Sequence, residues 1–541
     1  MLIKLINNFY SFRKIIKLNK RIFKDQPKKT KNEILIEFNN FAASHISLSY
    51  CANILKNKHN ANLTAYPGHV LLSYPLKQKL IKKIKYFFGK VFNINFFGVY
   101  KSFGINKFHY PKINDHIKKL ADHTHKKFLK DIKSLRQLEH FKIKKILMGD
   151  LLYDTYLKNH YHLSPTINLN NKEFQKFAFD FICLFYIWDH YINTKNIKAI
   201  ISSHAVYTIG LPARICASKK IETYILTHEQ IWKLKDLHPT QYYEVHKFKK
   251  IFKKIKIGKQ KKLKELAKQR LEARLKGAYT SDYSYITKSP FGINKKIKIS
   301  KKKKNIFVIA THDFVDAPHA MGHSLFPDFY QWFIYLCEVS KKTEDIWLVK
   351  NHPDFGEDYS KYVQYERDVT NNICSKYKNI KVLHKDTTLN DLVKIKVDAV
   401  FTVNGTIGVD RSILNIPVIN ASLNNPHINY KFNYHPKSVK ELEDIILNFR
   451  IHKKKIKIDK NEIYEFYAMR NIYFSKNWFY PNLNKIIKDI KSYHNLSKPM
   501  FYDYWVKNYD SFDEKLTVKN LKKYFYSKNI FLLNNNKFGK Y

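Results

Sequence analysis

Short apolar strands that alternate with helices constrain the fold of this chain more than any other feature of its sequence. In the first half, buried-type strands are predicted at residues 33–38 (EILIEF), 62–66 (NLTAY), 198–202 (KAIIS) and 222–227 (ETYILT), with helices at residues 172–194 and 211–219. The rhythm restarts in the second half, where strands are predicted at residues 305–311, 345–350, 380–383, 399–403 and 417–420. Because parallel strands need helical crossovers, this alternation predicts parallel sheets with helices on both faces.

The length of the chain adds a division into domains. At 541 residues it exceeds what a single core usually organises, so we expect at least two domains. The predicted segments are a basic N-terminal segment (1–32), a first Rossmann-like domain (33–250), a basic helix and linker (251–304), a second Rossmann-like domain (305–436), and C-terminal helices with a tail (437–541). The linker stands out because it carries 17 Lys and 2 Arg against three acidic residues. The expected fold class is therefore α/β, with two Rossmann-like domains facing a cleft and extra helices at the termini.

The net positive charge of the chain is large, but it says little about which partners the chain binds. Lys and Arg number 98 against 45 Asp and Glu, which gives a net charge of +53. Lys, Ile, Asn, Phe and Tyr are abundant along the whole chain, so compositional bias explains most of this excess. No nucleic-acid recognition motif accompanies it, and we expect no nucleic-acid partner. An anionic membrane surface stays a candidate partner.

The sequence shows no clear targeting signal, and its cysteines are typical of a reducing compartment. No stretch approaches the roughly 18 apolar residues that a membrane span needs. The basic start, residues 1–24, lacks a small-residue cleavage site, so we expect a cytoplasmic protein, with peripheral attachment at the inner face of the cell membrane as an option. The five cysteines are scattered in apolar surroundings, which predicts buried free thiols.

Polar residues end two predicted strands of the second half, in DIWLVKNHP (345–353) and DAVFTVNGTIGVDRSILNIPVIN (398–420). Ligands of open α/β sheets bind beyond the carboxyl ends of the strands, so both strand ends are expected to face one phosphate-bearing ligand. The expected contact residues are Lys350, His352, Pro353, Asn404, Gly405, Thr406, Gly408 and Asp410. Gly405 permits a close backbone approach, and Thr406 at a helix start could cap the helix or donate to phosphate. The plain alternative is a strand–helix turn with Thr406 as its cap.

A third polar strand end is THDFVDAPH, residues 311–319. Its position after a central strand places it at the same expected edge. The predicted nucleotide contacts here are His312, Asp313, Asp316 and His319. His319 and His323 are four residues apart with Asp313 and Asp316 near, but no tight ligand pattern forms and Pro318 disfavours one continuous helix, so we expect no metal site.

The first half offers candidates for a general base. A sugar transferase needs a carboxylate or a histidine to deprotonate the acceptor hydroxyl. Asp150 opens the predicted helix GDLLYDTYL, while His204 and Glu229 follow two predicted strands. Each of the three has an ordinary alternative as a cap, a surface residue or a buried hydrogen-bonded group.

Five motifs carry a resemblance over residues 145–420. They are GDLLYDTYL, ISSHAVYTIGLPARICA, ATHDFVDAPHAMGHSLFPDFYQW, KNHP and VNGTIGVDRSILNIPVI. The chain resembles bacterial surface-carbohydrate, or capsule polysaccharide, biosynthesis proteins of the GT-B glycosyltransferase architecture. The resemblance implies a metal-independent glycosyltransferase without a cofactor, with a nucleotide-sugar donor in the second domain and a glycan or glycolipid acceptor in the first.

The resemblance also implies roles in donor binding. In related transferases that use CMP-activated Kdo or nonulosonic sugars, an HP motif and a later hydroxyl-bearing loop bind the nucleotide phosphate. That implies phosphate contacts for His352 and for Asn404 through Thr406. This loop has a single Thr where sialyltransferases often have paired hydroxyls, so the donor base stays open.

Two other readings keep the fold and change the function. One is a nucleotide-sugar 2-epimerase or a polyol-phosphate transferase of teichoic-acid type. The other is a non-catalytic glycan- or membrane-binding protein with a GT-B-like fold. The donor sugar, the linkage and the stereochemical outcome stay open as well.

Overall fold

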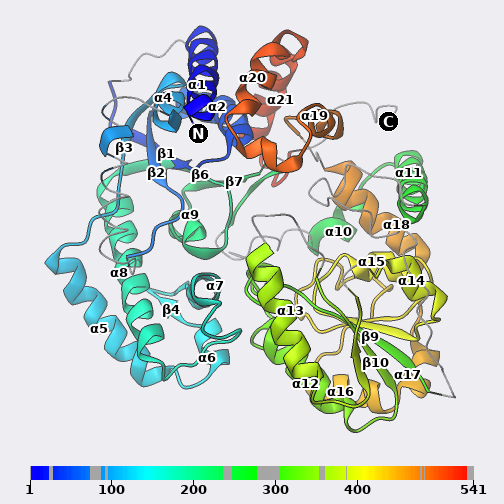
Figure 1. Cartoon of the computed structure of the whole chain (residues 1–541). Coiled ribbons are helices and arrows are strands. Elements are labelled where there is room, and N and C mark those ends of the chain that lie inside the picture. Colours follow the sequence, from blue (N-terminus) through cyan, green and yellow to red (C-terminus); the bar gives the residue numbers. More distant parts are fainter. Residues whose placement is uncertain are drawn as a thin grey trace. The chain divides into compact units, whose positions relative to one another are not determined.

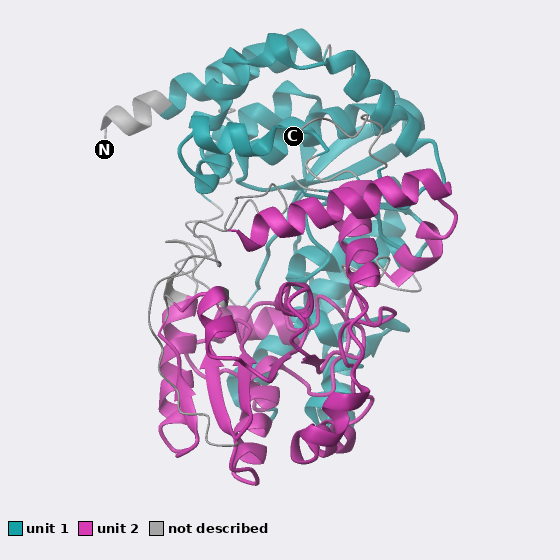
Figure 2. Cartoon of the chain, turned by 90° about the vertical axis from the view of Figure 1, so that its right-hand side faces the viewer, with its two compact units in different colours: residues 1–152, 169–239, 474–541 teal, residues 153–168, 240–473 magenta. Residues whose placement is uncertain are grey.

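The computed structural model of the chain describes residues 2–23, 29–72, 84, 87–89, 91, 95–227, 230–235, 246–276, 304–352, 360–384, 387–474, 478–480 and 482–532 (Figure 1). These residues form two compact units (Figure 2). Unit 1 comprises residues 1–152, 169–239 and 474–541, and unit 2 comprises residues 153–168 and 240–473.

Unit 1 is built on a six-stranded sheet with the order β3-β2-β1-β6-β7-β8. Its strands are β1 (Asn32–Phe38), β2 (Asn62–Pro67), β3 (Ile105–Phe108), β6 (Asn196–Ser202), β7 (Glu222–Leu226) and β8 (Ile231–Lys233). All pairs are parallel except β7 with β8. The strand order reverses direction at the β1–β6 pair, where Ile36 lies opposite Ile201, so this pair is the switch point of the sheet.

The core of unit 1 explains why these segments are strands. Ile34, Leu35 and Ile36 of β1 are fully buried, as a strand covered on both faces requires. Helices of this unit are α2 (Ala42–His59), α4 (Asn95–Ser102), α5 (Asp115–Asp131), α6 (Leu135–Glu139), α8 (Lys172–Thr194) and α9 (Tyr207–Ser218). A two-stranded hairpin, β4 (Lys142–Ile143) with β5 (Ile146–Leu147), precedes α7 (Gly149–His160).

The two ends of the chain complete unit 1. Helix α1 (Leu2–Ile22) and the C-terminal helices α19 (Leu483–Asp489), α20 (Met500–Lys507) and α21 (Glu514–Phe525) belong to it, with 3-10 turns at Tyr493–Ser497 and Tyr509–Ser511. Phe12, Phe501 and Trp505 pack in the same core as Ile36, and His45 Nδ1 lies 2.6 Å from Tyr502 Oη. The sequence treated residues 1–32 and 437–541 as additions outside the first domain. The structure divides the chain elsewhere, because aromatic residues of both ends fill the first core.

Unit 2 is built on a five-stranded parallel sheet with the order β11-β10-β9-β12-β13. Its strands are β9 (Ile306–Ala310), β10 (Ile346–Lys350), β11 (Ile380–Val382), β12 (Ala399–Thr402) and β13 (Val418–Asn420). Its helices are α10 (Phe248–Phe252), α11 (Ile257–Leu275), α12 (Phe329–Ser340), α13 (Ser360–Cys374), α14 (Leu389–Lys394), α15 (Ile407–Ser412), α16 (Val439–Leu447), α17 (Phe449–Lys455) and α18 (Lys460–Ala468), the last followed by a π-helical turn at Met469–Tyr473. The switch point is the β9–β12 pair.

The α/β fold class with two parallel-sheet domains is confirmed. Every predicted strand is present, and the predicted helix over residues 172–194 matches α8. The sequence missed β3 and β8, which are short edge strands, and α13, whose helical pattern is amphipathic but strongly polar. The five cysteines are buried free thiols, as predicted. Within the described residues, no helix has the length and apolarity to cross a membrane.

Candidate functional site

His312 anchors a loop at the switch point of unit 2. Its Nε2 lies 3.1 Å from Thr402 Oγ1 and accepts hydrogen bonds from the N–H groups of Val403 and Asn404, both at 3.3 Å. The ring stacks on Phe329 with 4.5 Å between centroids. Burial lowers the pKa of His312 to about 3, so the imidazole is neutral and carries its proton on Nδ1. His312 was predicted to contact the nucleotide, and its geometry is that of a residue that positions the loop.

The loop that His312 holds is accessible. Asn404, Gly405 and Thr406 are partly exposed between β12 and α15. A Cβ at Gly405 would lie 3.2 Å from Thr402 Oγ1 and 3.4 Å from His312 Cε1, so glycine allows the backbone to run close to the anchor. Thr406 has helical φ and ψ and makes no side-chain capping hydrogen bond. Thr406 thus stands at the N-cap position, but the alternative in which its side chain caps α15 is wrong, and its hydroxyl is not used by that helix.

Two cationic side chains with lowered pKa values lie at the end of β10 and in α15. Lys350 ends β10, and its Nζ donates to the Thr387 carbonyl oxygen at 3.0 Å. Burial, with the positive charge of Arg411 adding to it, lowers the pKa of Lys350 to about 8. Arg411 in α15 has no exposed surface, and burial lowers its pKa to about 10. Both cations are disfavoured by burial, so an anion bound near them would stabilise their charged forms.

A pair of buried carboxyl groups lies at the ends of β9 and β10. The Thr311 hydroxyl donates to Glu366 Oε1 at 2.6 Å and accepts from the His352 N–H at 3.1 Å. Burial, increased by the charge of Asp313, raises the pKa of Glu366 to about 8. Burial and then Asp316 raise the pKa of Asp313 to about 6. Carboxyl groups that titrate near neutral pH can donate or accept protons in a reaction.

Other predicted residues of unit 2 have structural partners. Asp316 accepts from Lys158 Nζ at 3.1 Å, and His319 Nδ1 lies 2.6 Å from Asp154 Oδ1. A Cβ on Gly408 would lie 2.5 Å from Asn433 Oδ1, so Gly408 is a packing position. Pro353 lies outside the described residues.

Asp410 is held by an arginine. Its two carboxylate oxygens accept from Arg274 Nε and Nη2, each at 3.0 Å, and both side chains are buried. The pair fastens α11 to α15. The geometry is therefore that of a structural ion pair, whereas the sequence suggested a contact to the phosphate-bearing ligand.

The switch point of unit 1 gathers a different set of groups. Glu37 ends β1 and is buried, and its carboxylate accepts from the Ser203 N–H. Its Oε1 also accepts from the Ser203 hydroxyl at 2.9 Å, and its Oε2 from the Ser202 hydroxyl at 3.3 Å. Gly68 follows β2, and a Cβ there would lie 2.5 Å from Glu37 Oε1. The carboxylate is thus fixed between three strand ends.

His204 continues this network to the surface. It is exposed, and its Nδ1 lies 2.9 Å from Ser203 Oγ. Because the Ser203 hydroxyl donates to Glu37, it accepts from Nδ1–H of His204. Nε2 of His204 is therefore the nitrogen that carries the lone pair. The chain Glu37–Ser203–His204 sets the tautomer that a general base needs.

Asp150 is placed differently from the prediction for a base. Arg214 binds both of its oxygens, with Nη1–Oδ1 at 2.5 Å and Nη2–Oδ2 at 2.8 Å, and also donates to the Leu147 carbonyl oxygen at 2.9 Å. Asp150 and Arg214 are both buried. This is a structural ion pair at the start of α7. Glu229 lies outside the described residues.

Sequence reasoning missed three residues of these edges. Glu37 had a signal, because an acidic residue at the end of the apolar strand EILIEF needs a buried partner. Thr311 was inside a quoted motif but was not selected. Glu366 had no signal, because it sits in a helix among other charged residues.

Comparisons with known proteins show distant likenesses. No family profile and no curated protein matches the chain. Among solved structures, the KpsC β-Kdo 2,4-transferase of Thermosulfurimonas dismutans is 12% identical, with a TM-score of 0.32 over 51% of this chain and 79% of that one. The UDP-GlcNAc 2-epimerase of Neisseria meningitidis bound to UDP-GlcNAc is 9% identical, with a TM-score of 0.22 over 81% and 97%. The UDP-GlcNAc 2-epimerase of Methanocaldococcus jannaschii in complex with UDP-GlcNAc and UDP is 9% identical, with a TM-score of 0.25 over 85% of this chain and 99% of that one. We therefore base the function on the geometry of this chain.

Proposed function

We propose that the chain is a GT-B-type glycosyltransferase that transfers a sugar from a nucleotide donor, with the donor phosphate bound at the β9–β12 switch point of unit 2. One observation carries this proposal. His312 fixes the backbone of Val403 and Asn404 in a partly exposed loop at the switch point. The same unit holds a cation at the end of β10, Lys350, and a buried one in the helix that follows the loop, Arg411. A fixed loop at a switch point, in a unit with these two cations, is suited to a phosphate group.

The same residues would assist bond cleavage. Negative charge develops on the departing phosphate as the glycosidic bond breaks, and donors that are already in place stabilise it. Lys350 supplies positive charge, and Thr406 supplies a hydroxyl that α15 does not use. His352, fixed through its N–H to Thr311, is a further phosphate contact in this proposal.

His204 is the proposed general base. Its Nε2 carries the lone pair because Ser203 and Glu37 orient the ring through Nδ1. Asp150 cannot take this role without giving up the charge balance of buried Arg214, so we assign it to the support of α7. The acceptor would be a surface polysaccharide or lipid-linked glycan handled at the inner face of the membrane. A CMP-activated Kdo or nonulosonic acid is the donor that the sequence resemblance favours.

Nucleotide binding tests the donor site. Calorimetric titration with CMP, UDP, CDP and GDP is expected to identify one nucleotide that binds the wild type. Replacing the partly buried cation, Lys350→Met, should weaken that binding by about 10–100-fold, because a charge-assisted contact to phosphate is lost. Lys381→Met is the matched control, since Lys381 is exposed on the neighbouring strand β11. Equal affinities in both variants would contradict the phosphate site.

A second function is favoured by the carboxyl pair. Asp313 and Glu366 have raised pKa values within the donor unit, so they could move protons on the donor sugar itself, as a nucleotide-sugar 2-epimerase requires. Product analysis separates the two functions. Incubation of the nucleotide sugar without acceptor should leave it unchanged if the chain is a transferase, whereas an epimerase would interconvert the sugar and lose this activity in Glu366→Gln.

A further inference from the structure

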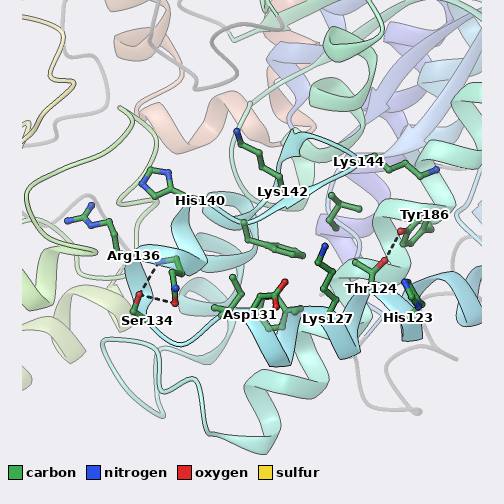
Figure 3. Close-up of a pocket in the computed structure, with 15 residues that line it drawn as sticks. His123, Thr124, Lys127, Asp131, Ser134, Arg136, His140, Lys142, Lys144 and Tyr186 are labelled. Atoms are coloured by element: carbon green, nitrogen blue, oxygen red, sulfur yellow. Dashed lines mark hydrogen bonds between the residues drawn. The ribbon is translucent and has the colours of Figure 1, made fainter.

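A cavity of about 590 Å³ lies within unit 1 and includes none of the residues that the sequence singled out (Figure 3). Helix α5 lines one side with Thr124, Lys127 and Phe128, and the β4–β5 hairpin lines another with Lys142 and Lys144. Helix α6, Tyr186 of α8 and the segments on either side of α6 also line it. This volume is in the range of small-ligand sites.

The walls of this α5 cavity are fixed by hydrogen bonds and ion pairs. Thr124 Oγ1 lies 2.7 Å from Tyr186 Oη, which joins α5 to α8 (Figure 3). Lys144 Nζ donates to Asp189 at 2.7 Å, and Lys219 reaches the same carboxylate at 3.3 Å, so the hairpin is tied to α8. A ligand would therefore meet a cavity that is largely formed before it binds.

The turn and the base of the β4–β5 hairpin are also constrained. Both turn residues, Lys144 and Lys145, have left-handed φ angles of 50° and 68°. Gly149 follows the hairpin, and a Cβ there would lie 1.7 Å from the Leu138 carbonyl oxygen, so only glycine lets α6 pack against the start of α7. The position of Lys142 above the cavity is thus set by the backbone.

The charge of the lining is strongly positive. The lining contains four cationic side chains, Lys127, Arg136, Lys142 and Lys144, and a single carboxylate, Asp131. Arg136 pairs with Glu139 at 2.9 Å and Lys144 with Asp189, so these two charges are balanced. Lys127 and Lys142 have no ion pair within the described part of the chain. Two lysines from opposite sides of one cavity attract an anionic group.

The lining also contains aromatic rings. Phe128 and Phe141 meet edge to face, with 4.9 Å between ring centroids, and Tyr186 adds a third ring. Aromatic faces bury the apolar faces of a small ring-shaped ligand while the polar groups fix its orientation. The combination of aromatic rings with two lysines suits a sugar ring that carries an acidic group.

We propose that the α5 cavity binds an acidic sugar residue, one bearing a carboxylate or a phosphate, as part of the glycan that the enzyme extends. The assignment of this sugar to the acceptor glycan rests on the proposed function. The binding of an acidic sugar in the cavity does not depend on donor chemistry. Lys127 and Lys142 would bind the acidic group, and the aromatic rings would contact the sugar ring.

Binding measurements on the full chain test this proposal. The probes are a disaccharide that ends in glucuronic acid, its counterpart with glucose, glucose 6-phosphate and inorganic phosphate. We expect the glucuronic acid probe or glucose 6-phosphate to bind at least about tenfold more tightly than the neutral disaccharide and than inorganic phosphate. Which of the two binds better identifies the acidic group.

A matched pair of variants separates the cavity from the general charge of the chain. Lys127→Ala with Lys142→Ala should weaken binding of the acidic sugar by about tenfold or more. Lys119→Ala with Lys130→Ala removes two exposed charges of α5 that do not line the cavity, and should leave binding unchanged. Equal weakening by both pairs, equal binding of neutral and acidic sugars, or inorganic phosphate binding as tightly as the sugars would overturn the proposal.

The outcome is distinguishable from a failure of the donor site. Nucleotide binding should be the same in wild type and in the Lys127–Lys142 variant, because these residues lie in unit 1 and the proposed phosphate site lies in unit 2. Acidic-sugar binding without nucleotide binding would uphold the cavity and contradict the transferase. Nucleotide binding without acidic-sugar binding would contradict the proposal for the cavity and leave the proposed donor site standing.

Discussion

The two units have the same kind of parallel sheet but different chemistry at its carboxyl edge. In unit 2 the edge holds titratable groups whose pKa values are shifted by burial, namely His312, Asp313, Lys350 and Glu366. In unit 1 the edge holds a hydrogen-bonded chain that ends in an exposed histidine, Glu37–Ser203–His204. The difference indicates that unit 2 is suited to charge on a ligand, and unit 1 to proton removal from an accessible hydroxyl.

Each unit also has one buried arginine–aspartate pair, Asp150–Arg214 in unit 1 and Asp410–Arg274 in unit 2. Replacing either aspartate by alanine removes the carboxylate that balances a buried guanidinium and should cost about 3–5 kcal/mol of unfolding free energy. Asp115→Ala and Glu344→Ala are the controls, because they remove exposed ion pairs worth about 0–1 kcal/mol. Urea denaturation measures the difference. If Asp150→Ala were no more destabilising than Asp115→Ala, the pair would not support α7.

The same variants test whether the units are independent. Calorimetry should show that Asp150→Ala lowers the melting of unit 1 and Asp410→Ala that of unit 2, as two separate transitions. A single transition that both variants lower equally would show that the units unfold together.

The second prediction concerns Glu366. Its pKa in the folded state, about 8, lies above the usual value of 4.5, so the folded state keeps a proton that the unfolded state has lost. The contribution of this group to stability is therefore full below about pH 4.5, decreases as the pH rises from there to about 8, and is then constant. The total change is on the order of a few kcal/mol.

Glu366→Gln should abolish this part of the pH dependence. Unfolding free energies at pH 5 and pH 8 would then differ less than in wild type. Glu344→Gln, at an exposed position of the same unit, should keep the slope of wild type. A wild-type slope in Glu366→Gln would mean that Glu366 is already ionised at neutral pH.

The third prediction uses the lowered pKa of Lys350. Its ammonium loses charge as the pH rises through about 8, so nucleotide affinity should fall above pH 8 by up to about tenfold per pH unit. Glu366 becomes anionic in the same window and adds to the fall. Titrations at pH 7, 8 and 9 should therefore show a steep slope in wild type, a smaller one in Glu366→Gln and the smallest in Lys350→Met. A slope that Lys350→Met does not change would contradict its contact to phosphate.

The sheets were predictable from sequence because buried parallel strands are continuous apolar runs. Residues 198–202 and 399–403 are runs of this kind, and they overlap the observed strands β6 and β12. That Lys350 and the Asn404 loop end strands on the same edge was also predictable, because β10 and β12 both run parallel to β9. The packing of the C-terminal helices α19, α20 and α21 in unit 1 was not predictable, because their aromatic residues give no sign of which core they fill.

The roles of individual charged residues were harder to predict. Asp150 and Asp410 each stand in the first turn of a helix, where a catalytic carboxylate and a structural one have the same sequence pattern. Their partners, Arg214 and Arg274, lie 64 and 136 residues away in the chain. A pairing over such distances depends on the tertiary fold, so a sequence without its structure cannot assign it.

The smallest expected effect concerns Ser203, which positions His204 through Nδ1. Ser203→Ala removes the link to Glu37, so the ring can rotate and adopt either tautomer, and kcat should fall by about 3–10-fold. The KM for the donor should not change, because Ser203 belongs to unit 1. Ser202→Ala is the control, since Ser202 contacts Glu37 and the His204 carbonyl oxygen but not the imidazole ring. If His204 is the base, the acidic limb of the pH–rate profile should shift in Ser203→Ala and stay in place in Ser202→Ala. A fall in kcat of the same size in both variants, without that shift, would indicate that Ser203 only stabilises the strand end.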